Sequence, residues 1–410
     1  MDMTFLKRFL SSLALSSIAF AMAFTEVAGA ADPIKIGMTV SSQGRFALAA
    51  QSGERGLKIW INDVNSRGGI SINGQKRKIE LVSLDDRSDK AMVPRVYETL
   101  IKEKGVDILF GPFGSTLTGA AANTTEQFDK FLMIWSASSD AIYEQGYKYV
   151  VSGSQIAASR MSHPSIRALK AVGVKSIAFA YLDEPFPAGV TKGAIAYAKE
   201  LGMKVTMEEK FAKGTKDFSL IIQKALATGA DAFYPTGYEG DQMIMARQLR
   251  EQGANFPATY MVYAAQPQFL EIGKDAHYIM GQTLLHEKIN WKVNAGLSRE
   301  QVMASYNKLF PNVAYQPDFQ TALAYSAGAV LEQIIIKADS IDPAKMKQAA
   351  LDLNEKLTVM TGPYKIEPTG KQVSMEFVIM QNSKNGPEVV YPNAIATMKP
   401  IYPAPSYSNR

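Results

Sequence analysis

Residues 108–116 read Ile-Leu-Phe-Gly-Pro-Phe-Gly-Ser-Thr, and residues 131–140 read Phe-Leu-Met-Ile-Trp-Ser-Ala-Ser-Ser-Asp. Each stretch is an apolar run, typical of a buried strand, that ends in small and hydroxyl-bearing residues. In an open α/β sheet, ligands bind just beyond the carboxyl ends of the strands. Hydroxyls and free backbone N–H groups there can hold an anionic group without a metal ion or a catalytic residue. The two stretches therefore predict a site for a small ligand.

Strand and helix patterns alternate around these two stretches. Strands are expected at residues 34–40 and 78–84, with helical patterns between the strands. This alternation predicts βαβ units and a parallel sheet, so the expected fold class is α/β. The pattern restarts over residues 176–262, which predicts a second α/β lobe of similar size. Two consecutive lobes favour a ligand cleft between them, where their strand ends face each other.

The expected domain boundaries follow from this restart. The chain is expected to cross back to the first lobe over residues 281–291, and a long apolar helix at 319–337 is expected in that lobe. The expected segments are a signal peptide at residues 1–30, a first lobe at 31–152 plus about 287–342, and a second lobe at 153–286 plus about 343–390. An irregular tail at 391–410, which contains four prolines, is expected to follow.

The N-terminus has the features of a signal peptide. Lys7 and Arg8 precede an apolar segment at 9–24, and Ala28-Gly29-Ala30 provides small residues at a cleavage site. This pattern predicts export, with Ala31 as the mature N-terminus. The alternative is a transmembrane anchor, but the apolar segment contains four serines and is shorter than the roughly 20 residues that a span needs.

Composition excludes several classes of protein. The chain of 410 residues has no cysteine, which excludes disulfides, thiolate metal sites and a lipid-anchored lipoprotein. The formal net charge is +5, and basic residues are mixed with acidic ones rather than gathered in a patch, so a nucleic-acid partner is not expected. We therefore expect a soluble, periplasmic and monomeric protein without a lipid anchor.

Motifs for catalysis are absent from the sequence. It contains neither a phosphate-binding loop nor a Gly-x-Ser-x-Gly nucleophile elbow. The three histidines, His163, His277 and His286, are far apart and none belongs to a His-Glu-x-x-His pattern. Zinc hydrolysis and Ser-His-Asp chemistry are therefore not expected. We predict a protein that is not an enzyme and that uses no cofactor or metal.

Short motifs in a specific order resemble the type I periplasmic solute-binding proteins of ABC importers, and within them the branched-chain amino acid (leucine/isoleucine/valine) binding family. The resemblance implies two Rossmann-like lobes joined by a multi-strand hinge, capture of a ligand by closure of the hinge, and delivery to a membrane permease. The motifs are Ile34-Lys35-Ile36-Gly37, Gly44, Gly53, Gly56, Ile61-Asn62-Asp63, Gly68-Gly69-Ile70, Asn73-Gly74, Asp85-Asp86, residues 106–111 with Ser115-Thr116, residues 231–238 and Thr361-Gly362-Pro363.

The resemblance also implies a ligand site. Ser115 and Thr116 match the family's hydroxyl pair after the third strand, and Ala137, Ser138 and Ser139 match its residues after the fourth. Charge-assisted hydrogen bonds from hydroxyls and backbone N–H groups are strong in a closed cleft. These residues therefore form an expected carboxylate clamp, although each could instead only cap a strand end.

Aromatic residues match the family's other contact positions. Phe186, after the first strand of the second lobe, and Tyr238 correspond to residues that cover the ligand. Phe113, Trp135 and Tyr263 could add flat apolar walls. Arg45, beside Phe46 in the loop after the first strand, could add a positive contact or be exposed to solvent.

Two acidic residues of the family have no counterpart at the expected positions. Amino-acid binders hold the ligand's ammonium group with acids that should fall within residues 153–158 and 261–266, but neither stretch contains Asp or Glu. We expect Ala264, in the second stretch, to contact the ligand instead. A buried ammonium without a counter-charge costs several kcal/mol. The hypothesis is a carboxylic acid that lacks an α-amino group and is aromatic.

Alternatives stay open at this point. A shift of the alignment by one or two residues would let another acid serve an ammonium group, and the ligand would then be an amino acid or an amide. A ligand sensor of the same fold is a second function class, and an exported enzyme is a third. The acids that such a shift would bring into place are Asp183, Glu184, Glu239 and Asp241.

Overall fold

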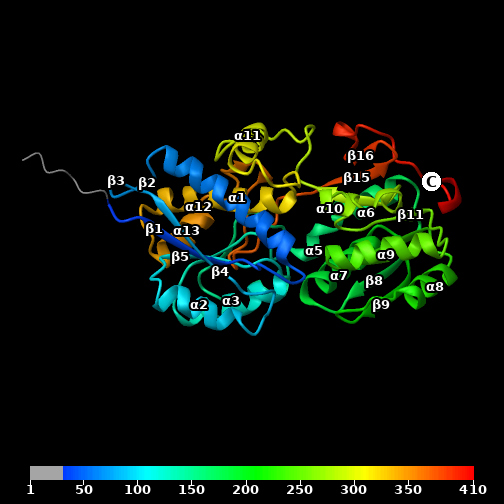
Figure 1. Cartoon of the computed structure of the whole chain (residues 1–410), viewed down its shortest axis with the longest axis horizontal. Coiled ribbons are helices and arrows are strands. Elements are labelled where there is room, and N and C mark those ends of the chain that lie inside the picture. The colour runs from blue at the N-terminus through cyan, green and yellow to red at the C-terminus, as the bar shows by residue number, and fades with distance from the viewer. Residues whose placement is uncertain (1–30) are drawn as a thin grey trace, which may run out of the picture.

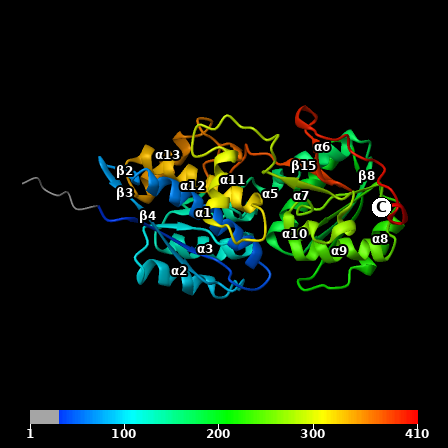
Figure 2. The same cartoon turned by 45° about the horizontal axis from the view of Figure 1, so that its top comes forward.

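A computed structural model describes residues 31–410, and the expected signal peptide, residues 1–30, lies outside the described residues. The chain forms two lobes, seen in Figure 1 as the blue, cyan and orange half and the mainly green half. Figure 2 shows the same division after a rotation, so it does not depend on the direction of view. The expected α/β fold with two Rossmann-like lobes is confirmed.

The first lobe is built on a five-stranded parallel sheet with the order β4-β1-β5-β6-β7. The chain order reverses between β1 and β5, and ligands bind outside the carboxyl ends of the strands at such a switch point. The expected hydroxyl-rich segments follow β5 and β6. The strands are β1 (Ile34–Thr39), β4 (Ile79–Leu84), β5 (Ile108–Phe110), β6 (Leu132–Ile134) and β7 (Val150–Ser152), with a small hairpin of β2 (Ile70–Ile72) and β3 (Gln75–Arg77).

Helices cover both faces of this sheet. Helix α12 (Phe319–Ala338) is apolar around most of its circumference and packs along α1 (Ala47–Ser66). The two backbones approach so closely at Gly56 that a Cβ there would lie 2.1 Å from the carbonyl oxygen of Thr321. The other helices are α2 (Val93–Lys102), α3 (Ser115–Gln127), α4 (Asp140–Tyr143), α11 (Arg299–Leu309) and α13 (Pro343–Asp352).

By length and composition, α12 is the one helix of residues 31–410 that could cross a membrane, but 89% of its most apolar window is buried inside the protein. A helix that is hydrophobic all round is expected at the centre of a large core. We therefore assign α12 to the core of the first lobe.

The second lobe repeats the topology of the first. Its parallel sheet has the order β11-β10-β8-β9, which again places the first strand of the lobe between the second and the third. The strands are β8 (Ser176–Leu182), β9 (Lys204–Phe211), β10 (Ala232–Thr236) and β11 (Ala258–Thr259). The helices are α5 (Ala158–Met161), α6 (His163–Ala171), α7 (Pro185–Glu200), α8 (Ser219–Ala227), α9 (Glu239–Glu251) and α10 (Pro267–Leu270). A 3-10 turn, η1 (Gly273–Ala276), follows α10.

An antiparallel sheet extends the second lobe. It consists of β12 (Met280–Thr283), β15 (Val378–Ser383) and β16 (Gly386–Tyr391) in that order. A bridge between Tyr260 and Met280 connects it to the end of β11. The tail after Tyr391, drawn in red in Figure 1, returns along this lobe and contains the 3-10 turns η2 (Asn393–Ile395) and η3 (Tyr407–Asn409).

Segments that connect the lobes lie side by side. The segment after β7 enters the second lobe, and the segment before β15 enters it again from the first. The backbone N–H of Ser152 donates to Gly370 at 2.8 Å, and that of Ala157 donates to Gln372 at 3.1 Å. A third connection leaves the second lobe after β12. Hydrogen bonds between connections are consistent with a hinge of several strands.

Two sequence-based assignments need correction. Helix α13 was expected in the second lobe, but its buried face, which includes Met346 and Ala350, packs against α12 and β7 of the first lobe. The short pair β13 (Thr358–Val359) and β14 (Gly362–Pro363) follows α13, and β13 contacts α12. The pattern over residues 176–262 also predicts a last strand that reaches residue 262, but β11 ends at Thr259 and the chain turns after Tyr260.

Candidate ligand-binding site

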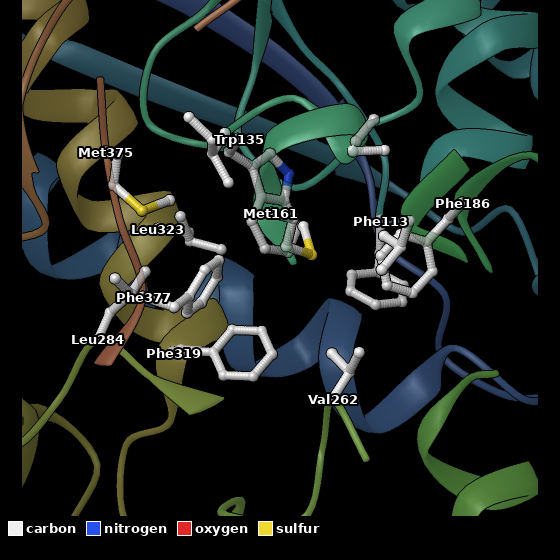
Figure 3. Packing of buried hydrophobic residues seen from close by; sticks show 14 of the residues in the cluster. Phe113, Trp135, Met161, Phe186, Val262, Leu284, Phe319, Leu323, Met375 and Phe377 are labelled. Carbon is white, nitrogen blue, oxygen red and sulfur yellow. The ribbon is translucent and has the colours of Figure 1, made fainter. Parts of the chain in front are cut away.

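Aromatic side chains from both lobes meet between the strand ends. The ring of Tyr238, in the second lobe, has its centroid 4.8 Å from that of Phe46 and 5.5 Å from that of Phe186. Phe113, which follows β5 of the first lobe, lies 6.3 Å from Tyr238 and 6.0 Å from Trp135. All five rings are buried. Rings of the first lobe thus contact Tyr238 of the second, so the cleft is closed at this point; Figure 3 labels Phe113 and Phe186 in this region.

The aromatic contacts continue toward the connections between the lobes. Tyr263, after β11, has its ring centroid 6.5 Å from Phe186 and 5.8 Å from Phe319 of α12. Phe319 in turn lies 5.4 Å from Phe377, just before β15. Figure 3 shows Phe319 and Phe377 on the side of the site away from Phe113. Aromatic rings therefore surround the space between the lobes.

A cavity lies inside this ring of aromatic side chains, and with the lobes in this arrangement its free volume is about 20 Å³, roughly room for one water molecule. This is far less than a small-molecule ligand occupies, so a ligand requires the lobes to lie further apart than they do here. The lining contains aromatic, aliphatic, hydroxyl and amide groups and no charged side chain. The lining residues are Phe113, Gly114, Ser136, Gln155, Met161, Phe186, Tyr238, Val262, Tyr263, Gln282, Phe319, Gln320, Leu323 and Phe377.

Two polar side-chain atoms of this lining are buried without a hydrogen-bond partner: the hydroxyl of Tyr238 and Nε2 of Gln282. Burial is also the main cause that raises the pKa of the Tyr238 hydroxyl, so this group stays protonated. Buried polar groups in native proteins are nearly always bonded. The two unpartnered donors are therefore candidates for ligand contacts.

The hydroxyl-rich strand ends lie beside this cavity. Ser115, the first residue of α3, accepts hydrogen bonds through Oγ from the backbone N–H groups of Ser138 and Ser139, at 3.2 and 3.1 Å. The serine hydroxyl thereby retains its own proton for another acceptor. Oγ of Ser138 is buried without a partner. Sequence reasoning grouped these residues, and the structure brings them together.

The predicted ligand contacts fall into three groups. Phe113, Phe186 and Tyr238 line the cavity. Ser115, Thr116 and Ser139 line a neighbouring surface pocket that also contains Lys90 and Pro185. Ala137, Ser138, Ala264 and Arg45 line neither of these two spaces, and Ala137, Ser138 and Ala264 are fully buried. A role of all ten residues in binding stays a prediction.

Arg45 pairs with an acid of the opposite lobe. Its Nη2 lies 2.6 Å from both carboxylate oxygens of Glu184, and the guanidinium stacks over Phe46 and Tyr238. The hydroxyl of Thr116 lies 3.5 Å from the same carboxylate. Arg45 lies in the loop after β1, which is held by Asp85 and Asp86 at the end of β4. These two carboxylates accept hydrogen bonds from the hydroxyl groups of Thr39, Ser41 and Ser42.

The remaining acids near the cleft have other partners or stay neutral. Asp183 pairs with exposed Lys210, and Asp241 accepts the backbone N–H of Tyr238 as part of the N-terminal cap of α9. Glu239 lies near Asp318 of the first lobe and its Oε1 is buried without a hydrogen-bond partner. Burial is the main cause that raises the pKa of Glu239 to about 8, and the nearby carboxyl groups add to it.

Several cavity residues were missed by sequence reasoning. Gln155 lies in the first connection, after β7, Gln282 lies on β12, and Gln320 belongs to α12. Only Gln155 stood within a stretch that the sequence had marked as part of the site. The others come from segments that reach the cavity through the closure of the two lobes, and no local spacing indicates such contacts.

Comparison with known proteins agrees with this architecture. The sequence profile described as periplasmic binding protein matches residues 33–387. The chain belongs to the periplasmic binding protein family. It is similar to Leu/Ile/Val-binding protein homolog 7 of Brucella suis, with 25% identity over 93% of this chain and 97% of the relative. The predicted membership in the branched-chain amino acid group of substrate-binding proteins is confirmed, and the chain is a substrate-binding protein of that type of ABC transporter.

Solved structures share the fold. A leucine-binding protein of Thermotoga maritima has 22% identity and a TM-score of 0.75, with 87% of this chain and 97% of that chain covered. A solute-binding protein of an ABC transporter from R. palustris, in complex with 4-hydroxybenzoate, has 18% identity and a TM-score of 0.74, with 92% and 98% covered. Identities this low establish the common fold and not the ligand.

Proposed function

We propose that this binding protein captures a small carboxylic acid that lacks an α-amino group and has an aromatic body. The observation that carries the proposal is the lining of the cavity, which is aromatic and amide-rich and contains no charged side chain. An aromatic ligand would stack on or contact the edges of Phe113, Phe186 and Tyr263, and such contacts add to the free energy of burial.

An α-amino acid fits this environment poorly. Its ammonium group needs a carboxylate, because an unpaired buried charge is strongly destabilising. Among the alternative acids considered from the sequence, Asp183, Glu184 and Asp241 already have partners. Glu239 is absent from the cavity lining, and with a pKa of about 8 it is largely protonated at neutral pH. These contacts favour a ligand without a positive charge.

Uncharged donors suit the ligand's carboxylate. The hydroxyl of Tyr238 has no partner, and the Ser115 hydroxyl keeps its proton because its oxygen already accepts two N–H groups. Hydrogen bonds to a carboxylate are about twice as strong as neutral ones. The R. palustris relative that holds 4-hydroxybenzoate lends support to an aromatic acid by analogy of fold.

The wider biological role is part of the same proposal. The protein is exported by its N-terminal signal peptide, works in the periplasm as a monomer without a lipid anchor, and binds its ligand by hinge closure. The closed form docks on the membrane permease subunits, and the ligand leaves chemically unchanged. Charged residues are mixed along the chain, which gives no support to a nucleic-acid partner.

Calorimetry with purified mature protein tests the ligand class. We expect benzoate or a 4-hydroxycinnamate to bind, and leucine and valine to give no binding heat. Tight leucine binding with no response to aromatic acids would overturn the proposal in favour of an amino-acid binder. A chemically altered ligand after incubation would instead indicate an enzyme.

A pair of tyrosine variants tests the site. Tyr238→Phe keeps the ring and removes the unpartnered hydroxyl, so it should weaken binding of the aromatic acid about tenfold, as expected for a lost hydrogen bond to a charged group. Tyr364→Phe is the control, because its hydroxyl is equally buried and unpartnered but lies outside the cavity lining. Equal affinities of both variants would contradict this position for the carboxylate.

A further inference from the structure

Gln282 presents a free amide donor to the cavity. The residue is on β12, is 1% exposed, and lines the cavity. Its Oε1 accepts a hydrogen bond of 2.7 Å from the hydroxyl of Tyr260, while its Nε2 is buried without a partner. One end of the amide is therefore held by the protein, and the other end is left for something in the cavity.

The orientation of this amide is fixed by the groups behind it. Tyr260 is fully buried with its ring centroid 4.5 Å from that of Tyr234, whose hydroxyl bonds to Ser165 Oγ at 2.8 Å. Burial raises the pKa of the Tyr260 hydroxyl well above its ordinary value, so this hydroxyl stays protonated and can donate to Gln282. The backbone of Gln282 is held by the pairing of β12 with β15. The amide group is thus preorganised to donate through Nε2.

Gln282 pairs on β12 with Ile379 of β15, which comes two residues after Phe377 of the cavity lining. In Figure 3, Leu284, two residues further along the chain, lies with Phe377 on one side, and Phe113 and Phe186 lie on the other. Gln155, a further amide of the lining, has its Nε2 bonded to the carbonyl oxygen of Ile156 at 3.2 Å. Among the side-chain amides of the lining, Gln282 is therefore the one whose Nε2 is buried without a hydrogen-bond partner.

The chemistry of the partner follows from the lining. An amide N–H needs an oxygen acceptor, and the cavity lining has no cation that would balance a second negative charge. A neutral oxygen, as in a phenolic hydroxyl or a carbonyl group, fits both conditions. A ligand with a methyl group at that position would leave the amide unpaired, and sites built to hydrogen-bond a substituent discriminate strongly against analogues that lack it.

We propose that Gln282 is a specificity-determining residue that donates to a neutral oxygen on the end of the aromatic acid opposite its carboxylate. This inference rests on the proposed function, because it assumes an aromatic carboxylic acid in the cavity. It adds that the preferred ligand carries a hydroxyl or carbonyl substituent at its far end. It also assigns the recognition of that substituent to one side chain of the antiparallel sheet formed by β12, β15 and β16.

Matched ligand pairs and variants test the assignment by calorimetry. The pairs are 4-hydroxybenzoate with 4-methylbenzoate, and 4-hydroxycinnamate with 4-methylcinnamate. The members of a pair differ only in the hydroxyl or methyl substituent, and the two pairs differ in the distance between that substituent and the carboxylate. The wild-type protein should prefer the hydroxyl compound of the fitting pair by about tenfold or more. Gln282→Leu should reduce that preference to within about twofold while still binding the methyl compound. Gln223→Leu, at an exposed position of α8, is the control for the substitution itself.

Tyr260→Phe provides a second, milder variant if Gln282→Leu folds poorly. It removes only the hydroxyl that orients the amide, so it should lower the preference partially. A full preference in Gln282→Leu, or no preference in the wild-type protein despite binding of both acids, would overturn the role of Gln282 and leave the proposed function intact. If the wild-type protein binds none of the four acids, the proposed function itself fails.

Discussion

Arg45 and Glu184 join the two lobes by a salt bridge in which Nη2 of the arginine lies 2.6 Å from each carboxylate oxygen. The pair is 139 residues apart in sequence, and its side chains are only 25% and 12% exposed. It exists only when the loop after β1 and the start of α7 approach each other. The pair therefore stabilises the closed arrangement of the lobes independently of what the cavity holds.

Glu184→Gln should weaken ligand binding by about fivefold, because a partly buried ion pair contributes about 1 kcal/mol and binding requires closure. Calorimetry gives the affinity, and small-angle scattering should show a more open unliganded protein. Asp183→Asn is the matched control, since its pair with Lys210 is exposed and lies within the second lobe. An unchanged radius of gyration and affinity in Glu184→Gln would contradict the role of the pair in closure.

Glu239 should make stability depend on pH. Its folded-state pKa is about 8, above the ordinary value of 4.5, so the folded protein binds a proton that the unfolded chain releases. Stability contributed by this proton is present at low pH and is lost as the pH rises from about 4.5 to 8. Thermal unfolding at pH 5.5 and 8.5 should show the decrease.

Glu239→Gln should remove most of that decrease and raise the free energy of unfolding at pH 8.5 by about 2 kcal/mol, after allowance for partial exposure. Glu251→Gln, at an exposed position at the end of the same helix, should leave the pH dependence as it is. The same pH profile in wild type and Glu239→Gln would show that another group titrates.

Ser115→Ala should lower stability as well as binding. Its Oγ accepts two backbone N–H groups, and their loss leaves two buried donors unpaired, at a cost of about 1–3 kcal/mol. Ser138→Ala should weaken binding without this loss, because its own Oγ has no partner. Denaturant unfolding and calorimetry on both variants separate the two effects. Equal destabilisation by both changes would contradict the bonding pattern described for the clamp.

Gly53→Ala should destabilise the first lobe by about 1–3 kcal/mol, as expected for overpacking of a core. The added Cβ would lie 2.1 Å from Cη2 of Trp135, whose Nε1 is bonded to the carbonyl oxygen of Gly111 at 2.8 Å. Gly119→Ala is the control: it lies in α3 with open space around its Cβ, and should stabilise the helix by up to about 1 kcal/mol. Thermal unfolding measures both changes.

The centre of the first sheet was predictable from the sequence because its strands β5 and β6 are short, fully buried apolar runs. The run before Gly111 became β5, and the run before Trp135 became β6. The lobe to which α13 belongs was not predictable in this way. Its buried stripe, with Met346 and Ala350, fits any apolar surface, and the pattern does not say which lobe supplies that surface.

The candidate site was predictable where it consists of strand ends and not where lobe closure completes it. Phe113 and Tyr238 follow β5 and β10, so the rule on carboxyl ends of strands indicates them. Two residues of the cavity lining, Gln282 and Phe319, were not predictable in this way. Gln282 lies on β12, in the segment that was predicted only to cross between the lobes, and Phe319 begins α12, a helix of the core. Arg45 was considered as a ligand contact, but its partner in the structure is an acid of the other lobe.

The hydrogen bonds from Ser152 to Gly370 and from Ala157 to Gln372 tie two connections into one narrow ribbon between the lobes. Each lobe can then rotate as a unit while its own sheet stays intact. Under the proposed hinge closure, the thickness of the bound molecule would set the angle at which the lobes come to rest, and that angle would set the distance between their outer surfaces. The size of the solute would then affect both its contacts in the cavity and the shape of the outer surface that the closed protein presents to a partner.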